Sequence, residues 1–265
     1  MTDQQPGPQL ESKRIKRAAR QLSRGGKFRF TLRNLYYKLI RTGDWPQPKQ
    51  DPLETLEQFK NSLQAYEDQH GPVPGRIRNV DRLSEMDLAT LPPDVADYTT
   101  RRVLVCDRQE VFLSFVFNGF FRKLEIGLLL WPDYPKLVAN QIHEHLRSGS
   151  KTTLYLLHDC NRAGYDFKET VQEAFQEHGK KAQIVDLGMR FRQASNLGIP
   201  IRSDTAREDS SDLDPLQFGD SGERQEARLM LRSGCFAHLE ELPPLRMLRW
   251  TYSRIATRTQ DVGYG

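Results

Sequence analysis

The chain has 265 residues, of which 37% are hydrophobic and 28% are charged, a balance typical of a globular protein with one large domain or two smaller ones. Its three cysteines are too few and too scattered for a disulfide framework or a paired-cysteine zinc site. No apolar stretch is long enough to span a membrane, and the first residues lack the apolar core of a secretory signal, so we expect a cytoplasmic protein without a membrane partner.

The formal net charge is +4, but it is unevenly distributed along the chain. Residues 1–42 carry eleven Lys and Arg against only Asp3 and Glu11, whereas the rest of the chain is net acidic. Such an asymmetry indicates a polyanionic partner for the N-terminal part, and we expect that partner to be double-stranded DNA.

The N-terminal part reads as three helices. The basic segment 11–24 predicts a short helix that a glycine pair ends, and Thr31 is a candidate N-cap for a second helix over 32–42. A third helical pattern runs over 53–66. Helix, glycine break and helix are the outline of a helix-turn-helix or winged-helix module.

We divide the chain into a basic winged-helix-like module at 1–91, a linker at 92–100, and a second domain at 101–265. Within the second domain, residues 203–224 hold seven acidic side chains and read as a solvated loop. The leucine-rich tail at 226–258 predicts C-terminal helices that pack back on the α/β core.

The second domain alternates short apolar runs with helical patterns, which predicts an α/β fold with a parallel sheet. Strands are expected at residues 103–106, 126–130, 153–157 and 182–187. Helices are expected at about 110–121, 136–147 and 167–178.

Asp107 and Asp159 each follow one of these predicted strands directly or nearly so. Ligands of open α/β sheets bind at the carboxyl ends of the strands, so the two acids are candidates for one site. Asn161 and Gly164 complete a D-x-N-x-x-G arrangement, and oxygen ligands on such loops suit Mg²⁺ or Mn²⁺. The spacing equally allows Asp107 and Asp159 to be ordinary turn or cap residues.

The segments CDRQEVF, WPDYPK and HDCNRAG, in this order between residues 103 and 167, resemble the Toprim domain of the topoisomerase VI A subunit and its Spo-eleven relatives. The N-terminal TLRNLYYKL is similar to the T-x-R-x-I-Y-Y segment of the winged helix in that family. The resemblance implies a winged helix followed by a Toprim sheet, and metal-dependent DNA cleavage by a homodimer. It places the metal on Asp107, Asp159 and Asn161.

The resemblance also matches Tyr37 to the tyrosine that attacks the DNA backbone, with Arg33 and Lys38 able to hold the phosphate. A phenol with a pKa of ~10 needs a neighbouring cation or base to act as a nucleophile at neutral pH. Packing in an amphipathic helix, or contact with DNA, is the alternative role for this tyrosine.

Basic side chains around the second helix are the candidate contacts to DNA phosphates, which would give affinity with little choice of sequence. They are Lys27, Arg29, Arg33, Lys38 and Arg41. A merely solvated basic face is the alternative.

Two positions depart from the family pattern. Asp107 stands where the family has glutamate, and Asn161 stands where it has a second aspartate. Losing one carboxylate weakens a divalent site, so the cation site is expected to be weak, single or vestigial.

The chain has no phosphate-binding G-x-x-x-x-G-K-[ST] loop, so an ATPase would be a separate protein. The resemblance extends to the Toprim nuclease subunit of condensin-like Wadjet/Mks plasmid-defence systems, whose motor is of the SMC type. A topoisomerase VI B-like ATPase is the other partner that it implies. We expect a metal-dependent DNA-cleaving subunit; the alternatives are a tyrosine-dependent transesterase, or a catalytically weakened DNA-binding or assembly subunit.

Overall fold

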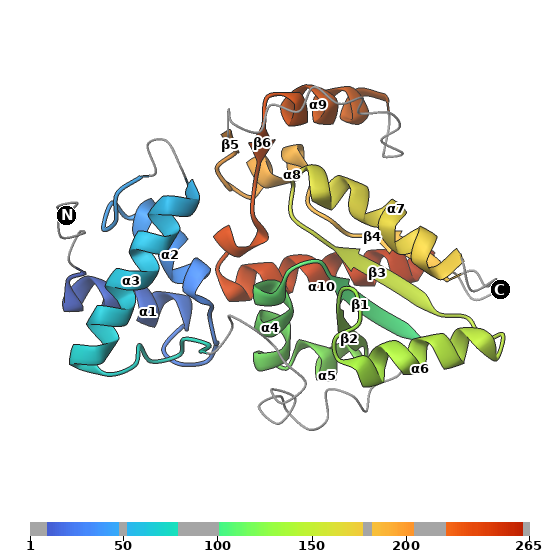
Figure 1. Ribbon diagram of the computed structural model, residues 1–265, viewed down its shortest axis with the longest axis horizontal. Coiled ribbons are helices and arrows are strands. Elements are labelled where there is room, and N and C mark those ends of the chain that lie inside the picture. Colours follow the sequence, from blue (N-terminus) through green and yellow to red (C-terminus); the bar gives the residue numbers. More distant parts are fainter. Residues whose placement is uncertain (1–9, 48–51, 79–100, 177–181, 204–220, 262–265) are drawn as a thin grey trace, which may run out of the picture. The chain divides into compact units, whose positions relative to one another are not determined.

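The computed structural model describes residues 10–47, 52–78, 101–176, 182–203 and 221–261. The chain forms two compact units (Figure 1). Unit 1 comprises Met1–Asn79 together with Glu240–Met247, and unit 2 comprises Val80–Leu239 together with Leu248–Gly265. The expected mixed α/β class is confirmed, since unit 2 contains a four-stranded parallel sheet.

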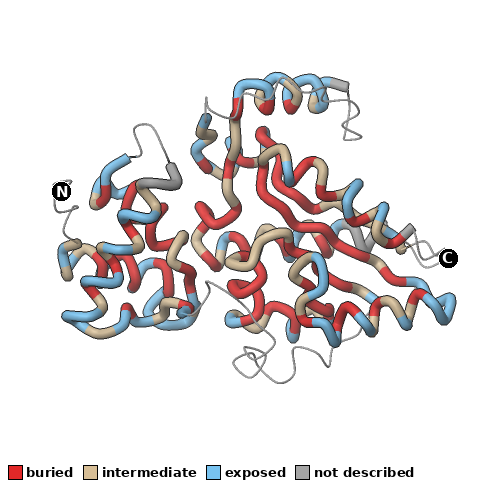
Figure 2. Tube along the Cα trace, in the orientation of Figure 1, coloured by how far each residue is buried: buried red, intermediate tan, exposed pale blue. Residues whose placement is uncertain are grey.

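Unit 1 contains helices α1 (Ser12–Leu22), α2 (Leu32–Arg41) and α3 (Pro52–His70). Helix α1 buries Ile15, Ala18, Ala19 and Leu22, which recur at the spacing of one helix face, and turns its basic side chains outward. The core gathers buried side chains from all three helices, among them Leu35, Tyr36, Leu39, Phe59 and Leu63. Figure 2 shows these buried faces in red.

Helix α2 begins where the sequence predicts. The Thr31 hydroxyl accepts a hydrogen bond from the Asn34 backbone N–H at 3.2 Å, and the Asn34 side chain accepts one from the Thr31 N–H at 2.9 Å. This capping box satisfies two backbone donors at the start of the helix. In the described part of unit 1 the β-structure is one isolated bridge between Phe30 and Arg76, so a two-stranded wing is not among these residues.

The segment Glu240–Met247 belongs to unit 1 through hydrogen bonds to helix α2. The Asn34 side-chain amide donates to the carbonyl oxygens of Glu240 at 2.7 Å and Leu242 at 3.2 Å. Arg41 donates to the carbonyl oxygen of Glu241 at 2.8 Å. Because Asn34 is buried, these bonds satisfy an amide that water cannot reach.

The sheet of unit 2 contains β1 (Arg102–Cys106), β2 (Gly127–Leu130), β3 (Thr153–Leu157) and β4 (Gln183–Asp186). Its order is β2-β1-β3-β4 and all pairs are parallel, as the alternating pattern predicts. Helices α6 (Lys136–Arg147) and α7 (Arg162–Gln176) share a core with alternate residues of β1 and β3. That core includes Val103, Val105, Leu154, Leu156 and Ile142.

Helices α4 (Gln109–Phe117), α5 (Phe120–Leu124) and α7 of unit 2 differ from the prediction. The single helix expected at 110–121 is two helices, α4 and α5, because Gly119 adopts a left-handed backbone with φ of 62°. Helix α7 begins at Arg162, earlier than expected, because Asn161 provides a cap that the apolar periodicity does not reveal.

The chain after β4 contains shorter elements. They are α8 (Phe191–Asn196), β5 (Arg202–Ser203), α9 (Ser221–Arg232), β6 (Cys235–Phe236), a 3-10 turn at Leu239–Glu241, and α10 (Pro244–Asp261). The expected pair of C-terminal helices is present as α9 and α10. The acidic loop expected at 203–224 is helical from residue 221, its residues 204–220 lie outside the described residues, and so does the linker at 92–100. Among the described residues, no helix combines the length and apolarity needed to cross a bilayer.

Candidate functional site

Asp107 and Asp159 lie together at the carboxyl edge of the sheet. Asp107 follows β1 directly, Asp159 follows β3 after one residue, and β1 and β3 are hydrogen-bonded neighbours. The Asp107 backbone N–H donates to the Leu157 carbonyl oxygen at 3.3 Å, and the Asp107 carboxylate accepts from the Asp159 backbone N–H. Adjacent parallel strands thus bring two acids distant in sequence into one place, as the sequence predicts.

The Asp159 carboxylate is fully buried and held by three donors. Its Oδ2 accepts from His238 Nδ1 at 2.7 Å and from Arg108 Nη1 at 2.9 Å, and its Oδ1 accepts from the Leu239 N–H at 2.7 Å. Burial alone would raise the pKa of Asp159, but the charge and hydrogen bond of His238, with Arg108 and the Leu239 N–H, outweigh it and hold that pKa well below its usual range. Asp159 is therefore ionised throughout the physiological pH range.

Asp107 has the opposite surroundings. Its Oδ1 is buried and has no hydrogen-bond partner. Burial, followed by the negative charge of Asp159, raises the pKa of Asp107 to about 7, although His158 and Arg108 oppose the rise. The two acids of the pair therefore differ in protonation near neutral pH, as close like charges in a shared site commonly do.

Asn161 has a structural task at the start of α7. Its Oδ1 accepts a hydrogen bond from the Gly164 backbone N–H at 2.8 Å, which is the bond of an N-cap residue. Gly164 is required there, because a Cβ at this position would lie 2.1 Å from the Asp159 carbonyl oxygen.

These residues, as arranged, do not fit a directly bound Mg²⁺ or Mn²⁺. Three acceptor positions of Asp159 are taken, Asn161 is engaged in its cap, and a permanently charged arginine lies against the acid. Within the described ranges, no group of three His, Cys, Asp or Glu side chains is placed to hold a metal ion. Of the three expected ligands, Asp107 alone presents an unpartnered oxygen.

Sequence reasoning missed Arg108 and His238. Arg108 stands beside Asp107 in the CDRQ segment, and a cation next to a strand-end acid is a signal that could have been read. His238 lies 79 residues after Asp159, and no local pattern links the two.

His158, which directly precedes Asp159 in the chain, is fully buried. Its Nδ1 lies 2.8 Å from the Asp159 carbonyl oxygen and its Nε2 lies 3.1 Å from Asp186 Oδ1. Gly188 leaves room for the ring, since a Cβ there would lie 1.8 Å from Nε2. The imidazole therefore supports the backbone that carries Asp159.

The residues expected to contact or attack DNA are divided between core and surface. Tyr37 is 6% exposed within the core of unit 1, with its ring centroid 5.2 Å from that of Tyr36. Arg33 lies 3.9 Å from the buried Glu240, and Arg41 is bonded to the backbone of the same segment. Lys27 and Arg29 are exposed in the turn before α2, whereas Lys38 is half-buried.

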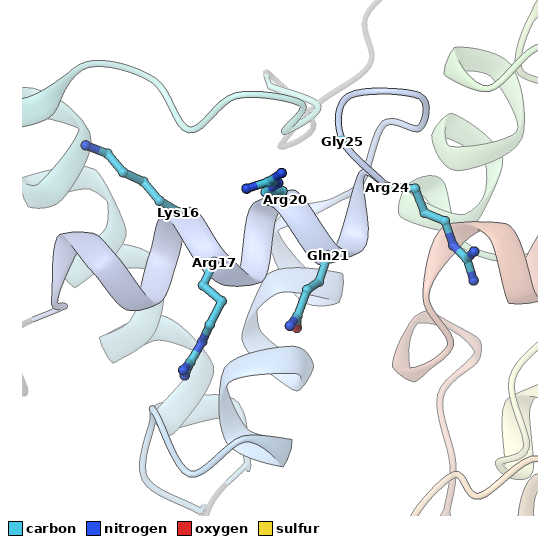
Figure 3. Close-up of a pocket in the computed structure, with 6 residues that line it drawn as sticks. All are labelled: Lys16, Arg17, Arg20, Gln21, Arg24 and Gly25. Atoms are coloured by element: carbon cyan, nitrogen blue, oxygen red, sulfur yellow. The ribbon is translucent and has the colours of Figure 1, made fainter.

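The basic residues of α1 form a second candidate site, which we call the α1 groove. It is an open hollow of about 880 Å³ (Figure 3). Its lining consists of Lys16, Arg17, Arg20, Gln21, Arg24 and Gly25. The lining contains four cations and no acid, although Arg17 also pairs with Asp44 at 2.9 Å.

The sequence matches no protein-family model and no curated protein at a significant level.

Proposed function

We propose that the chain binds duplex DNA through the α1 groove. The observation that carries this proposal is the lining of the groove, in which four cations gather on one exposed helix and turn without an acid among them. Basic side chains grouped in this way neutralise backbone phosphates and release the counterions condensed on them.

The arrangement on α1 suits a backbone rather than a small anion. Lys16 and Arg20 lie four residues apart on α1, a spacing that separates them by ~6 Å along the helix, and Arg24 lies in the turn after the helix ends at Leu22. The groove is open and its cations are exposed, so an extended polyanion can follow it. Such contacts position a duplex but carry no direct sequence information, so we expect binding without strong sequence preference.

Lys38 lies close enough to other cations of unit 1 for their charges to affect it. Burial is the main cause that lowers the pKa of Lys38, and the nearby charges of Arg41 and Arg17 lower it further against the opposing effect of Asp44. Phosphates that approach Lys38 would offset the repulsion from these neighbouring cations, which favours binding of a polyanion.

The proposal is tested by fluorescence anisotropy of a labelled duplex at several salt concentrations. The slope of the logarithm of the association constant against the logarithm of the salt concentration measures the number of phosphate contacts. In the double variant Lys16→Gln/Arg20→Gln we expect this slope to fall in magnitude by about 2, since each lost phosphate contact lowers it by about 0.9. A matched control, Lys123→Gln/Arg147→Gln, removes the same charge from exposed positions of unit 2 and should retain the wild-type slope. Absence of wild-type binding at low salt, or equal slopes in all three proteins, would refute the proposal.

A second candidate function is cleavage of the bound DNA, favoured by the buried, unpartnered Oδ1 of Asp107 beside Asp159. It is the activity that the topoisomerase VI A resemblance implies, together with a homodimer and a separate SMC/condensin-like or topoisomerase VI B-like ATPase. The test is incubation of supercoiled plasmid with the full chain, with and without Mg²⁺ or Mn²⁺. Nicked or linear product that Asp107→Asn abolishes supports cleavage, and intact plasmid under every condition opposes it. Tyr37→Phe then separates transesterification from hydrolysis.

A further inference from the structure

The Asp159 carboxylate is surrounded by donors from two segments of unit 2. Arg108 comes from the start of α4, and His238 and Leu239 come from the chain after β6. Together they use three of the roughly four lone-pair positions that a carboxylate offers. Since Asp159 has no exposed surface, a cation that bound it directly would have to displace one of these donors rather than a water molecule.

The backbone holds the histidine in this place. Cys160 and Ala237 form an antiparallel bridge, with N–H to carbonyl distances of 2.9 and 2.8 Å. The bridge sets Asp159 beside His238 on the neighbouring segment, so their hydrogen bond follows from main-chain pairing. Displacing His238 would therefore disturb the backbone as well as one side chain.

Arg108 brings a permanent positive charge to the acid, since a guanidinium does not lose its proton in proteins. Its Nη1 lies 2.9 Å from Asp159 Oδ2 and 3.5 Å from His238 Nδ1. A divalent ion at Asp159 would meet this charge at short range, and Asn161 supplies no second negative charge to offset the repulsion. The negative charge of Asp159 is therefore already neutralised by side chains of the protein itself.

We propose that Arg108, together with His238, is the counter-ion of Asp159 and takes the place that a divalent cation has in Toprim enzymes. Removing the charge of Arg108 then opens a divalent-cation site on Asp107 and Asp159. The wild-type chain then binds Mg²⁺ and Mn²⁺ only weakly at this edge of the sheet. This inference is independent of DNA binding by the α1 groove, and it opposes the metal-dependent form of the second candidate function.

The test uses the full chain with Mn²⁺ as the probe, and follows free Mn²⁺ by electron paramagnetic resonance. We expect the wild type to bind more weakly than ~1 mM and Arg108→Gln to bind at least ~10-fold more tightly, because the variant leaves Asp159 and the free Oδ1 of Asp107 without their cation. Melting temperature is a second measurement: Mn²⁺ should raise it in Arg108→Gln and leave it unchanged in the wild type.

Three variants identify the cause. Arg108→Lys keeps the charge and should exclude Mn²⁺ as the wild type does. Asp107→Asn in the Arg108→Gln background should abolish the gain. Arg147→Gln removes an exposed arginine from α6 and should have no effect.

Tight Mn²⁺ binding by the wild type that Asp159→Asn removes would overturn the proposal, and so would a folded Arg108→Gln protein that binds no more tightly than the wild type. If Arg108→Gln is unfolded without Mn²⁺, folding on its addition supports the proposal, and failure to fold with Mn²⁺ counts against it. DNA binding by the α1 groove can fail or succeed without changing any of these results.

Discussion

Replacing Gly188 with alanine should strongly destabilise unit 2, because the new methyl group would occupy the space of the His158 ring. A Cβ at Gly188 would lie 1.8 Å from His158 Nε2, 2.0 Å from Cε1 and 2.3 Å from Cδ2. His158 is fully buried and cannot turn into solvent, so either the ring or the backbone must move. A moved ring loses its 3.1 Å hydrogen bond to Asp186.

The expected cost has two parts. Overpacking a filled site costs about 1–3 kcal/mol, and losing a hydrogen bond to a charged group costs about 1.5–3 kcal/mol, so Gly188→Ala should lower the free energy of unfolding by about 2.5–6 kcal/mol. The assay is urea unfolding at pH 7, followed by circular dichroism. Gly149→Ala is the control, since nothing lies within 4 Å of a Cβ at that position. Its φ of +85° makes backbone strain the only expected cost, about 1–2 kcal/mol.

A double-mutant cycle isolates the steric cause. In a His158→Ala background the methyl group at position 188 finds the space of the missing ring, so its added cost should fall below about 1 kcal/mol. An equal cost of Gly188→Ala with and without His158 would refute the reasoning. A Gly188→Ala protein that is at least as stable as Gly149→Ala would refute the reasoning as well.

Three further predictions concern stability. Thr31→Ala removes the capping box with Asn34 and should cost about 1 kcal/mol in urea unfolding; no loss would mean that the cap is dispensable. Glu67→Gln weakens the ion pair with Arg76 and should cost about 1–3 kcal/mol, and an unchanged midpoint would contradict this. The pKa of Asp107 is about 7 in the folded protein and ~4 in the unfolded chain. Between about pH 4 and 7 the unfolded chain therefore loses this proton more readily, and the free energy of unfolding falls as the pH rises. Asp107→Asn should therefore exceed the wild type in stability by a margin that grows from about pH 4 to 7 and is then constant; a margin independent of pH would contradict the sign.

Much of unit 2 was predictable because β1, β2 and β3 are almost entirely buried and therefore read as continuous apolar runs. The expected strand at 153–157 coincides with β3, and the expected helix at 136–147 coincides with α6. The break between α4 and α5 was missed, although Gly119 follows an asparagine and such a pair marks a turn.

The candidate site was predictable only where neighbouring strands determine it. Asp107 and Asp159 meet because β1 and β3 are parallel neighbours, and ligands of such sheets bind at the carboxyl ends of the strands. The partners of Asp159 come from a bridge between Cys160 and Ala237, which depends on a non-local return of the chain that has no local pattern. The neighbour of Arg33 could not be predicted for the same reason, since Glu240 lies beside it in the fold but far away in the sequence.

The hydrogen bonds from Asn34 to the Glu240–Met247 segment also set an order of events during synthesis. Asn34 is separated by 206 residues from its first acceptor, so a ribosome that adds roughly 5–20 residues per second needs about 10–40 s to deliver that acceptor after Asn34 is made. Unit 1 therefore completes these hydrogen bonds only after Leu242 has been made. Nascent chains stalled before residue 240 should expose the Asn34 amide and be more readily cut by proteases in the α2 region than the finished protein.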